Sequence, residues 1–466
     1  MLQKRTFILL FFLSLVLVAC LNRTYKPVAE STPTQTTANP TADNTLNIWW
    51  NKGYYPEEDA AFRQIISEWE KKSPNKVKLS FITDANIIQQ TDKALSSNNL
   101  PDIFFAHLTD INWSPKWAWE GKLVDVSDVI DPVKNLYTPN AIESVYLYNN
   151  KVKKRSYYAV PIEQQTIHIS YWRDLLKDAG LSEREVPKDW DGFWNFWKQA
   201  QKNLRQQGQQ NIYAFGLPMS PGGSDTYFMF EQFLEAYKVR LLDENGQLLL
   251  DDPTTRQSII KVLDWCTNLY KEGYVPPNAL NWQNTDNNVN FLNKTALITA
   301  NPSLSIPTSQ KQDTDLYYDK IGTMEFPNQP DGKPTRYMAS VKQVVIFASS
   351  QHQKVAKEFL SFLIQPENLG AYIKNSAGRW FPVMPKLLKD PFWNDPKDPH
   401  LSVAVKQFTE RQIRPFYPAL NPAYVKVQQE NVWGQTLNRI LKDGLSPEQA
   451  ADEAIAKIKQ IFSEWK

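Results

Sequence analysis

Hydrophobic and polar positions follow two different periods in the segment that starts at Leu46. Apolar side chains alternate with polar ones over residues 46–50 and 77–81, which predicts two strands. Between them, apolar residues recur at intervals of three and four over residues 57–72, and this predicts an amphipathic helix that ends before Pro74. The pattern continues with a helix over 86–97 and a short buried strand over 103–106. This stretch therefore reads as strands alternating with helices.

The same two periods return along the rest of the chain. Asp189 and Asp252 are placed as N-caps of helices that end near glycines, and Ser446 opens the last helix with a capping-box pattern. Further strands are predicted over residues 157–161, 166–172 and 341–348, and a further helix over 354–364. Strands alternating with helices of this length favour an α/β fold built on parallel sheets with covering helices.

The first twenty residues have the layout of an export signal. Lys4 and Arg5 precede an apolar run over residues 7–18, which is the length of a signal-peptide core and too short for an ordinary membrane-spanning helix. The run ends at Val18-Ala19-Cys20, which resembles the bacterial lipobox. That resemblance implies a signal peptide over 1–19, cleavage before Cys20, and a lipid anchor on this cysteine; the alternative is a plain secretory signal.

Composition and length then indicate what the rest of the chain can form. Residues 20–45 are rich in Thr, Pro and Asn and carry few large apolar side chains, so they read as the anchor cysteine and a flexible tether. The remaining stretch of about 420 residues is long enough for two domains of about 100–200 residues each. Lys and Arg total 52 against 50 Asp and Glu, so no general attraction to nucleic acid is implied.

Signatures of catalysis are missing from the sequence. Cys266 is the single cysteine besides Cys20, and it falls on the apolar stripe of a predicted helix, so we expect it to pack in the core rather than react. The four histidines show no metal-ligand spacing, and no nucleophile elbow, phosphate-binding loop or dinucleotide fingerprint is present. We therefore expect no enzyme activity, no metal and no cofactor.

Several segments, taken in order, carry a resemblance to a known family. They are 99–105 (NLPDIFF), 119–126 (WEGKLVDV), 158–162 (YAVPI), 171–181 (YWRDLLKDAGL), 187–193 (PKDWDGF), 354–363 (KVAKEFLSFL) and 446–451 (SPEQAA). Together they resemble the family 1 extracellular solute-binding proteins, the sugar-binding, maltose-binding-protein-like receptors of ABC importers. Each segment alone is a weak pattern, but the likeness runs over nearly the whole chain after the tether.

The resemblance implies a two-lobed periplasmic-binding-protein fold of type II, with ligand held in the cleft between discontinuous lobes joined by a hinge. One lobe comprises 46–156 plus 340–376, and the other comprises 157–339 plus 377–466. The implied function is binding of a sugar or oligosaccharide on the extracytoplasmic face of a bacterial membrane, and delivery to ABC permease subunits. The protein is expected to act as a lipid-anchored monomer that binds no nucleic acid.

Sugar clefts combine stacking aromatic rings with polar side chains, which narrows the choice of ligand contacts. Some candidates follow predicted strands, where open α/β folds bind ligands, and others match cleft segments of the family. The candidates are Trp50, Asn51, Asp110, Asn112, Trp113, Glu163, Gln165, Asp225, Tyr227, Trp282, Asn301, Ser303, Arg379 and Trp380. For each of them ordinary packing or a solvated loop is the alternative. Asp225 and Tyr227 come from 222–227, which reads as a flexible polar stretch.

The sequence also departs from the family at two places. Gln165 falls where relatives often carry a ligand-contacting acid, and residues 301–303 (NPS) lack the Trp of the family's Gly-Pro-Trp loop. Stacking is then left to Trp282 or Trp380. Two other functions stay open at this point, namely a secreted glycoside hydrolase with paired carboxylates and a surface glycan-binding lipoprotein without a permease. The sequence does not identify the sugar.

Overall fold

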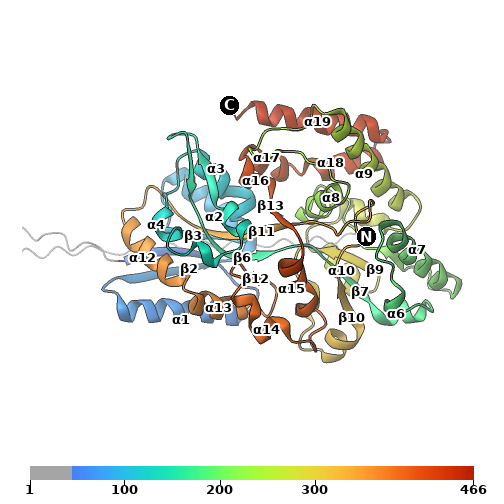
Figure 1. Cartoon of the computed structure of the whole chain (residues 1–466), viewed down its shortest axis with the longest axis horizontal. Coiled ribbons are helices and arrows are strands. Elements are labelled where there is room, and N and C mark those ends of the chain that lie inside the picture. Colours follow the sequence, from blue (N-terminus) through green and yellow to red (C-terminus); the bar gives the residue numbers. More distant parts are fainter. Residues whose placement is uncertain (1–44, 466) are drawn as a thin grey trace, which may run out of the picture. The chain divides into compact units, whose positions relative to one another are not determined.

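The computed structural model describes residues 45–465, so the predicted signal peptide, the lipidated Cys20 and the tether up to Asn44 lie outside the described residues. Two mixed sheets organise the described part of the chain (Figure 1). The first has seven strands in the order β12-β6-β11-β3-β1-β2, with β13 paired to β11. The second has four strands in the order β10-β7-β9-β8. A small hairpin, β4 with β5, stands apart from both.

The strands of the first sheet come from distant parts of the chain. They are β1 (Thr45–Asn51), β2 (Lys76–Ile82), β3 (Ile103–Phe105), β6 (Val160–Gln165), β11 (Tyr337–Ile346), β12 (Phe381–Pro382) and β13 (Ile413–Pro415). β1 is parallel to β2 and β3, whereas β11 runs antiparallel to both β3 and β6. The α/β class is therefore confirmed, with sheets that are mixed rather than wholly parallel.

The second sheet is formed by the middle of the chain. Its strands are β7 (His168–Trp172), β8 (Tyr213–Phe215), β9 (Ala296–Asn301) and β10 (Ile321–Met324), and the separate hairpin is β4 (Tyr146–Asn149) with β5 (Lys154–Tyr157). β7 pairs antiparallel with β9 and β10, and β8 pairs parallel with β9. Every residue of β7 and β9 is buried, because helices cover this sheet.

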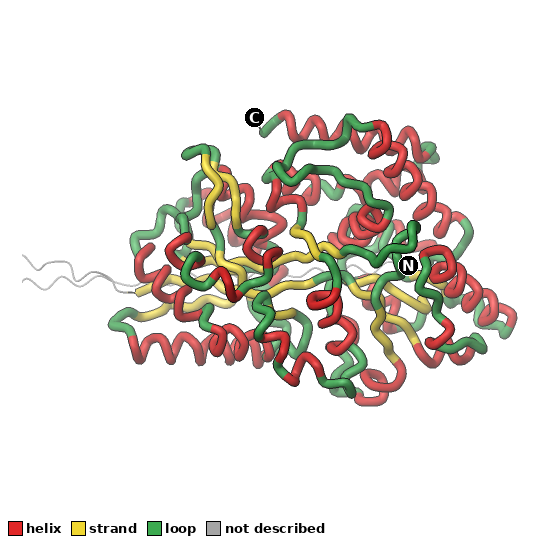
Figure 2. The backbone as a smooth tube through the Cα atoms, viewed as in Figure 1, coloured by secondary structure: helices red, strands yellow, loops and turns green. Residues whose placement is uncertain are grey.

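Helices pack outside the strands of both sheets (Figure 2). The α-helices are α1 (Pro56–Lys72), α2 (Asp84–Ser97), α3 (Ser114–Trp119), α4 (Ser127–Ile130), α5 (Pro139–Glu143), α6 (Arg173–Asp178), α7 (Trp190–Gln206), α8 (Ser224–Ala236), α9 (Pro253–Lys271), α10 (Asp286–Leu292), α11 (Ser305–Ser309), α12 (Gln353–Leu363), α13 (Pro366–Lys374), α14 (Pro391–Asn394), α15 (Leu401–Glu410), α16 (Tyr417–Leu420), α17 (Ala423–Gln429), α18 (Val432–Leu441) and α19 (Pro447–Ser463). Short π or 3-10 turns are η1 (Thr109–Trp113), η2 (Lys134–Leu136), η3 (Glu183–Glu185), η4 (Pro277–Asn281), η5 (Asp315–Lys320) and η6 (Leu387–Lys389).

The predicted helix starts are confirmed by their caps. The Asp189 carboxylate accepts a hydrogen bond of 2.8 Å from the Gly192 amide at the start of α7, and Asp252 accepts one of 3.0 Å from Thr254 at the start of α9. At α19, the Ser446 hydroxyl and the Gln449 side chain form the reciprocal capping box. Cys266 of α9 is fully buried in the core around the second sheet, as predicted, and burial raises the pKa of its thiol.

The two sheets are joined by segments that pass directly from one to the other. β6 belongs to the first sheet and β7 to the second, so the chain passes from one sheet to the other at residues 166–167. Leu388, Trp393, Leu401, Ala404 and Val405 share a hydrophobic core with β1, β3 and β11, whereas His400 hydrogen-bonds Thr323 of β10 in the second sheet. The lobe boundaries given by the sequence stay a proposal, and the strand pairing favours assigning β6 to the first lobe.

A buried charge network fixes the start of β11 to the second sheet's helices. Glu235 of α8 accepts hydrogen bonds from Arg336, at 2.5 Å, and from Arg414 of β13, at 2.7 Å. Arg336 directly precedes β11, and β13 pairs with the first three residues of that strand. The carboxylate is almost fully buried, so its two arginines are needed to compensate its charge.

Candidate functional site

Polar side chains from the strand ends of the first sheet form one side of the candidate site. Tyr54, which follows β1, donates a hydrogen bond of 2.5 Å from its hydroxyl to Asp84 at the start of α2. The Asn51 side-chain amide donates to the same carboxylate at 2.9 Å. Its side-chain oxygen accepts a hydrogen bond from the backbone amide of His107, which follows β3. Burial opposes ionisation of Asp84, but its interactions with His107, Tyr54 and Asn51 outweigh burial and lower its pKa.

Three aromatic rings and one guanidinium gather above these strand ends. The imidazole of His107 stacks on the indole of Trp380 with ring centroids 4.8 Å apart, and the Tyr54 ring lies 5.3 Å from His107 and 6.2 Å from Trp380. Arg379 lies over the Tyr54 ring, 3.4 Å from its centroid. We call Tyr54, His107, Arg379 and Trp380 the aromatic cluster. Its members come from both ends of the sequence and meet beside the first sheet.

Strand β11 adds a buried cation beside the aromatic cluster. The Lys342 ammonium lies 3.3 Å from the Asp110 carboxylate and donates to the Ser340 hydroxyl at 2.7 Å. Ser340 also hydrogen-bonds Asp110. The same ammonium is 5.9 Å from the Trp380 ring centroid, and only 2% of the Lys342 side chain is exposed. Asp110 and Lys342 therefore form a paired, hydrogen-bonded unit under the cluster.

Glu163 lies opposite Lys342 in the pairing of β6 with β11 and is completely buried. One carboxylate oxygen is 3.7 Å from the His107 Nε2, and neither oxygen has a hydrogen-bond partner among the described residues. Burial, and then the neighbouring Glu58 carboxylate, raise the pKa of Glu163 well above its usual value. A buried acid without a donor partner has unused capacity for a ligand hydroxyl or cation.

The second sheet contributes the side chains of α8. Burial raises the pKa of Asp225 to about 7, and the nearby Asn287 and Arg379 act in the opposite direction. At the start of the same helix, Tyr227 packs with Ile111 of η1 and Met338 of β11 in a small apolar cluster. Burial, and then the carboxylates of Asp110, Glu231 and Asp225, raise the pKa of the Tyr227 hydroxyl well above its usual value. Elements of both sheets thus converge on one group of polar and aromatic side chains.

Residues 222–227 were predicted to be a flexible polar stretch, and this prediction is wrong for its second half. Ser224 begins a helix that continues to Ala236. The reason lies just downstream, where the run from Phe228 to Leu234 is buried on every face of the helix. Asp225 and Tyr227 are therefore held by a rigid first turn instead of a mobile loop.

The structure divides the predicted ligand contacts into two groups. In the first group, Arg379 and Trp380 belong to the aromatic cluster, and Asp110 and Glu163 lie beside it. Asp225 and Tyr227 join this group from the start of α8, where Tyr227 packs with Ile111 of η1. Trp50 and Trp113 lie in hydrophobic cores, since Trp50 stacks on Phe62 and Phe105 and Trp113 stacks on Trp117. Their indole rings therefore support the first lobe from inside.

The remaining predicted residues have local partners. Asn51 positions Asp84 and His107, and the Asn112 carbonyl accepts a long hydrogen bond from Gln429. Gln165 pairs with Ser340 in the sheet and lines a small cavity. Trp282 belongs to the core around the second sheet. Asn301 hydrogen-bonds Asn288 and the Ser303 amide, so residues 301–303 form a self-contained turn.

Tyr54, Glu58, Asp84, His107 and Lys342 were not predicted as site residues. Two of them carried a signal in the sequence. His107 directly follows the buried strand at 103–106, and Lys342 is a charged residue inside an apolar strand. Tyr54 and Asp84 offered no comparable signal, because their role depends on how the loops after β1 and β2 approach each other.

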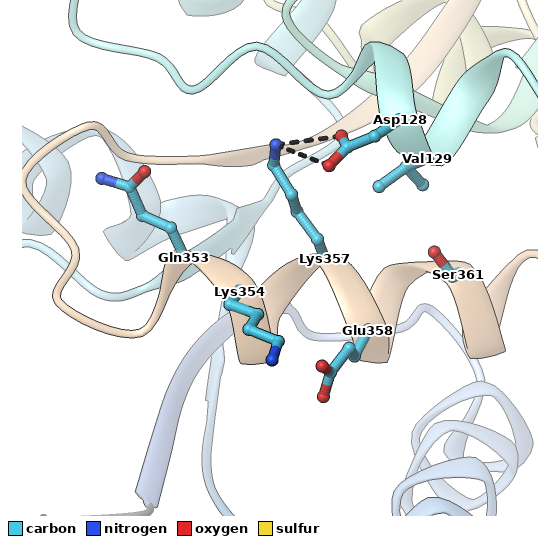
Figure 3. Close-up of a pocket in the computed structure, with 7 residues that line it drawn as sticks. All are labelled: Asp128, Val129, Gln353, Lys354, Lys357, Glu358 and Ser361. Carbon is cyan, nitrogen blue, oxygen red and sulfur yellow. Dashed lines mark hydrogen bonds and ion pairs between the residues drawn. The ribbon is translucent and has the colours of Figure 1, made fainter.

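An open groove lies between α4 and α12. Figure 3 shows Asp128 of α4 facing Lys357 of α12, whose ammonium is 2.9 Å from the carboxylate. The rest of the lining is formed by Val129, Gln353, Lys354, Glu358 and Ser361. Its charges are mixed, and its side chains are unlike the convergent aromatic and polar groups of the candidate site.

The described residues form neither a metal site nor a membrane-spanning helix. Among residues 45–465, no group of three or more His, Cys, Asp and Glu side chains could hold a metal ion. Across the same span, no helix combines the length and the apolar character needed to cross a membrane.

Comparison with known proteins decides the family. The model of the bacterial extracellular solute-binding proteins matches residues 64–402, which is well over half of the chain. The protein belongs to this family. The resemblance read from the sequence is thereby confirmed, and members of this family are binding proteins rather than enzymes.

Individual relatives agree with this assignment. The chain is 24% identical over 331 residues to the multiple sugar-binding protein of Streptococcus mutans, covering 68% of this chain and 70% of that protein. Its fold matches a solute-binding protein from Thermotoga lettingae solved with α-D-tagatose, with a TM-score of 0.71, 21% identity, and 90% and 99% of the two chains covered. It also matches a sugar transporter protein from Arthrobacter chlorophenolicus solved with laminaribiose, with a TM-score of 0.69, 16% identity, and 89% and 99% covered. The two-lobed α/β fold is therefore confirmed.

Proposed function

We propose that this solute-binding protein is the extracytoplasmic, lipid-anchored receptor of an ABC importer, and that it binds a sugar or oligosaccharide and delivers it to a membrane permease. The observation that carries the proposal is the aromatic cluster with its surrounding polar groups. Flat rings suit the C–H faces of a pyranose, and the adjoining carboxyls, Lys342 and Arg379 suit its hydroxyls. The sugars named for the relatives point the same way.

Binding on this proposal closes the two lobes and changes no covalent bond. α8 carries Asp225 and Tyr227 from the second sheet, and the strand ends of the first sheet carry Tyr54 and His107. A ligand in contact with both sets lowers the free energy of the closed form more than that of the open form, which shifts the population toward closure. Cys20 anchors the protein through its lipid, and residues up to 45 serve as a tether that raises its local concentration at the permease.

The binding step is tested by thermal shift across a carbohydrate library, followed by small-angle scattering with any ligand found. We expect a saturable rise in melting temperature and a smaller radius of gyration. A shift without compaction would contradict the closing mechanism. Incubation with labelled oligosaccharides tests the glycoside hydrolase alternative, and measurable turnover would replace the receptor proposal with that one.

The anchor is tested on the full-length protein by metabolic labelling with radioactive palmitate. Label is expected on the wild type and should be absent from Cys20→Ala, whereas Cys266→Ala should keep it because that thiol is buried. Delivery is tested by sugar uptake in cells lacking the gene. Unchanged uptake of the ligand would favour a surface glycan-binding lipoprotein without a permease.

A further inference from the structure

Acidic groups outnumber cations around the aromatic cluster. Lys342 is matched by Asp110, at 3.3 Å, so this pair is neutral as a unit. Asp84 is held by hydrogen bonds from Tyr54 and Asn51. The groups that remain are the carboxyls of Glu58, Glu163 and Asp225 and the single guanidinium of Arg379, which interacts electrostatically with all three. The site thus has an excess of carboxyls over cations.

The carboxyls of Glu58 and Glu163 are also short of hydrogen-bond donors. Glu58 of α1 accepts the Tyr55 amide at one oxygen, at 2.9 Å, and its other oxygen is buried without a partner in the described part of the chain. Both carboxylate oxygens of Glu163 are likewise buried without a hydrogen-bond partner among the described residues. Burying such groups is costly unless they hold a proton or meet a donor. Accordingly, burial raises the pKa of Glu58 to about 7 and that of Glu163 well above its usual value.

Groups from several elements face Glu163. α1 presents Glu58, α13 presents Tyr372, the loop after β3 presents His107, β11 presents Lys342, and the segment before β12 presents Arg379. His107 does not supply the missing charge, because burial lowers its pKa despite the attraction of Asp84. The two fixed cations are already engaged, Lys342 with Asp110 and Arg379 with the Tyr54 ring.

Trp380 adds a contact that suits a sugar ring. The Trp380 indole is 3% exposed, and its Nε1 has no acceptor among residues 45–465. An indole N–H can donate to an oxygen acceptor, and its ring face packs on an apolar surface. A sugar ring offers both contacts, whereas a free ammonium or a metal ion offers neither.

We propose that the site selects an amino sugar with a free amine, or an oligosaccharide containing one, whose ammonium group pairs with Glu163 and Glu58 while the ring stacks at Trp380. This rests on the proposed function and deepens it from sugars in general to basic sugars. Charge-assisted hydrogen bonds from the ammonium satisfy the carboxyl oxygens and replace the protons that they hold in the free protein. Binding of an amino sugar therefore releases protons, and binding of a neutral sugar does not.

The test compares matched sugars by isothermal titration calorimetry at pH 7. Glucosamine, galactosamine, mannosamine and chitobiose are each measured beside the N-acetylated form and the neutral hydroxyl form. At least one free-amine sugar is expected to bind at least tenfold more tightly than both of its counterparts. Repeating the titration in buffers with different ionisation enthalpies should show proton release for that sugar alone.

Two variants assign the preference to the proposed carboxyl. Glu163→Gln should reduce the amine-to-neutral affinity ratio at least fivefold, because the amide cannot pair with the ammonium as a charge. Glu231→Gln is the matched control. Glu231 is also buried, with its pKa raised to about 7, but it accepts a hydrogen bond from Tyr424 in the second lobe. This control should leave the ratio unchanged, and both variants are first checked for cooperative unfolding.

Several results would overturn the inference. They are equal or tighter binding of the neutral forms, a preference for uronic acids, an equal thermal shift from calcium chloride alone, or a full preference retained in Glu163→Gln. Any of the sugar results would leave the receptor proposal standing, because a sugar still binds. Failure of every carbohydrate class to bind would overturn both.

Discussion

The indole Nε1 of Trp50 donates a hydrogen bond of 3.0 Å to the hydroxyl of Tyr372. Trp50 lies on β1 and Tyr372 on α13, more than three hundred residues later in the chain. The ring of Trp50 is also stacked between Phe62 and Phe105, with centroids 3.8 and 4.2 Å away. This contact holds the start of the fold to a helix from its later part.

Replacement of Trp50 therefore tests stability rather than binding. Trp50→Ala is expected to lower the free energy of unfolding by about 3–5 kcal/mol, since it removes a fully buried ring and leaves a cavity. The ligand dissociation constant of the folded fraction should change less than threefold. Urea denaturation followed by titration of the ligand measures both quantities. A large loss of affinity at unchanged stability would return Trp50 to the list of ligand contacts.

For Trp380, in contrast, we expect replacement to weaken ligand binding. Trp380→Ala should raise the dissociation constant at least tenfold, equivalent to about 1.4 kcal/mol, because the stacking surface beside His107 is lost. Trp380→Phe should recover part of the affinity, as a smaller ring still stacks. Trp282→Phe is the control, since Trp282 packs in the core around the second sheet. If Trp282→Phe weakened binding as much as Trp380→Ala, the location of the site would be wrong.

Asp225 is expected to make the stability of the ligand-free protein depend on pH. Burial raises its pKa from 3.8 to about 7, so the folded state holds a proton that the unfolded state loses between these values. Its contribution to stability consequently falls as pH rises from about 4 to about 7. Asp225→Asn cannot ionise, so its stability relative to wild type should improve by about 1–3 kcal/mol between pH 5 and pH 8. Guanidinium denaturation of both proteins at the two pH values measures this, and a constant difference would contradict it.

The network around Glu235 is expected to support the start of β11. Glu235→Ala leaves Arg336 and Arg414, both partly buried, without their shared buried carboxylate, and should cost about 3 kcal/mol of stability. Glu325→Ala removes a partly exposed partner of Arg411 and should cost about 1 kcal/mol or less. Thermal unfolding of the two variants gives the comparison. Equal losses of stability would contradict the view that the buried Glu235 network contributes more than the partly exposed Glu325–Arg411 pair.

Much of the fold follows from local pattern. The spacing of Phe62, Ile65, Ile66 and Trp69 predicts the buried face of α1, and all four are buried. The same holds for Cys266 on α9 and for the caps at Asp189, Asp252 and Ser446, because these features depend on neighbours a few residues away. β11 was predicted over 341–348 and starts earlier, at Tyr337, because its first residues pair with β13. That pairing is set by residues far along the chain.

The residues of the site are harder to predict from local sequence pattern. Trp50 was proposed as a ligand contact because it ends a strand, yet the alternation that predicts β1 also puts it on the same buried face as Leu46 and Ile48. Position along a strand and direction of the side chain are separate questions, and the second was decisive. Tyr54, Glu58 and Asp84 come from a loop and two helix starts, and only the packing of these elements brings them toward Arg379 and His107.

The place of β11 in the first sheet also has a consequence during synthesis. This strand fills the gap between β3 and β6, although about 230 residues separate it from β3. Until residue 346 has emerged, the facing edges of β3 and β6 lack their neighbour and offer unpaired amides and carbonyls. Chains that stop short of this strand should consequently associate through those edges, while a chain extended past it should not.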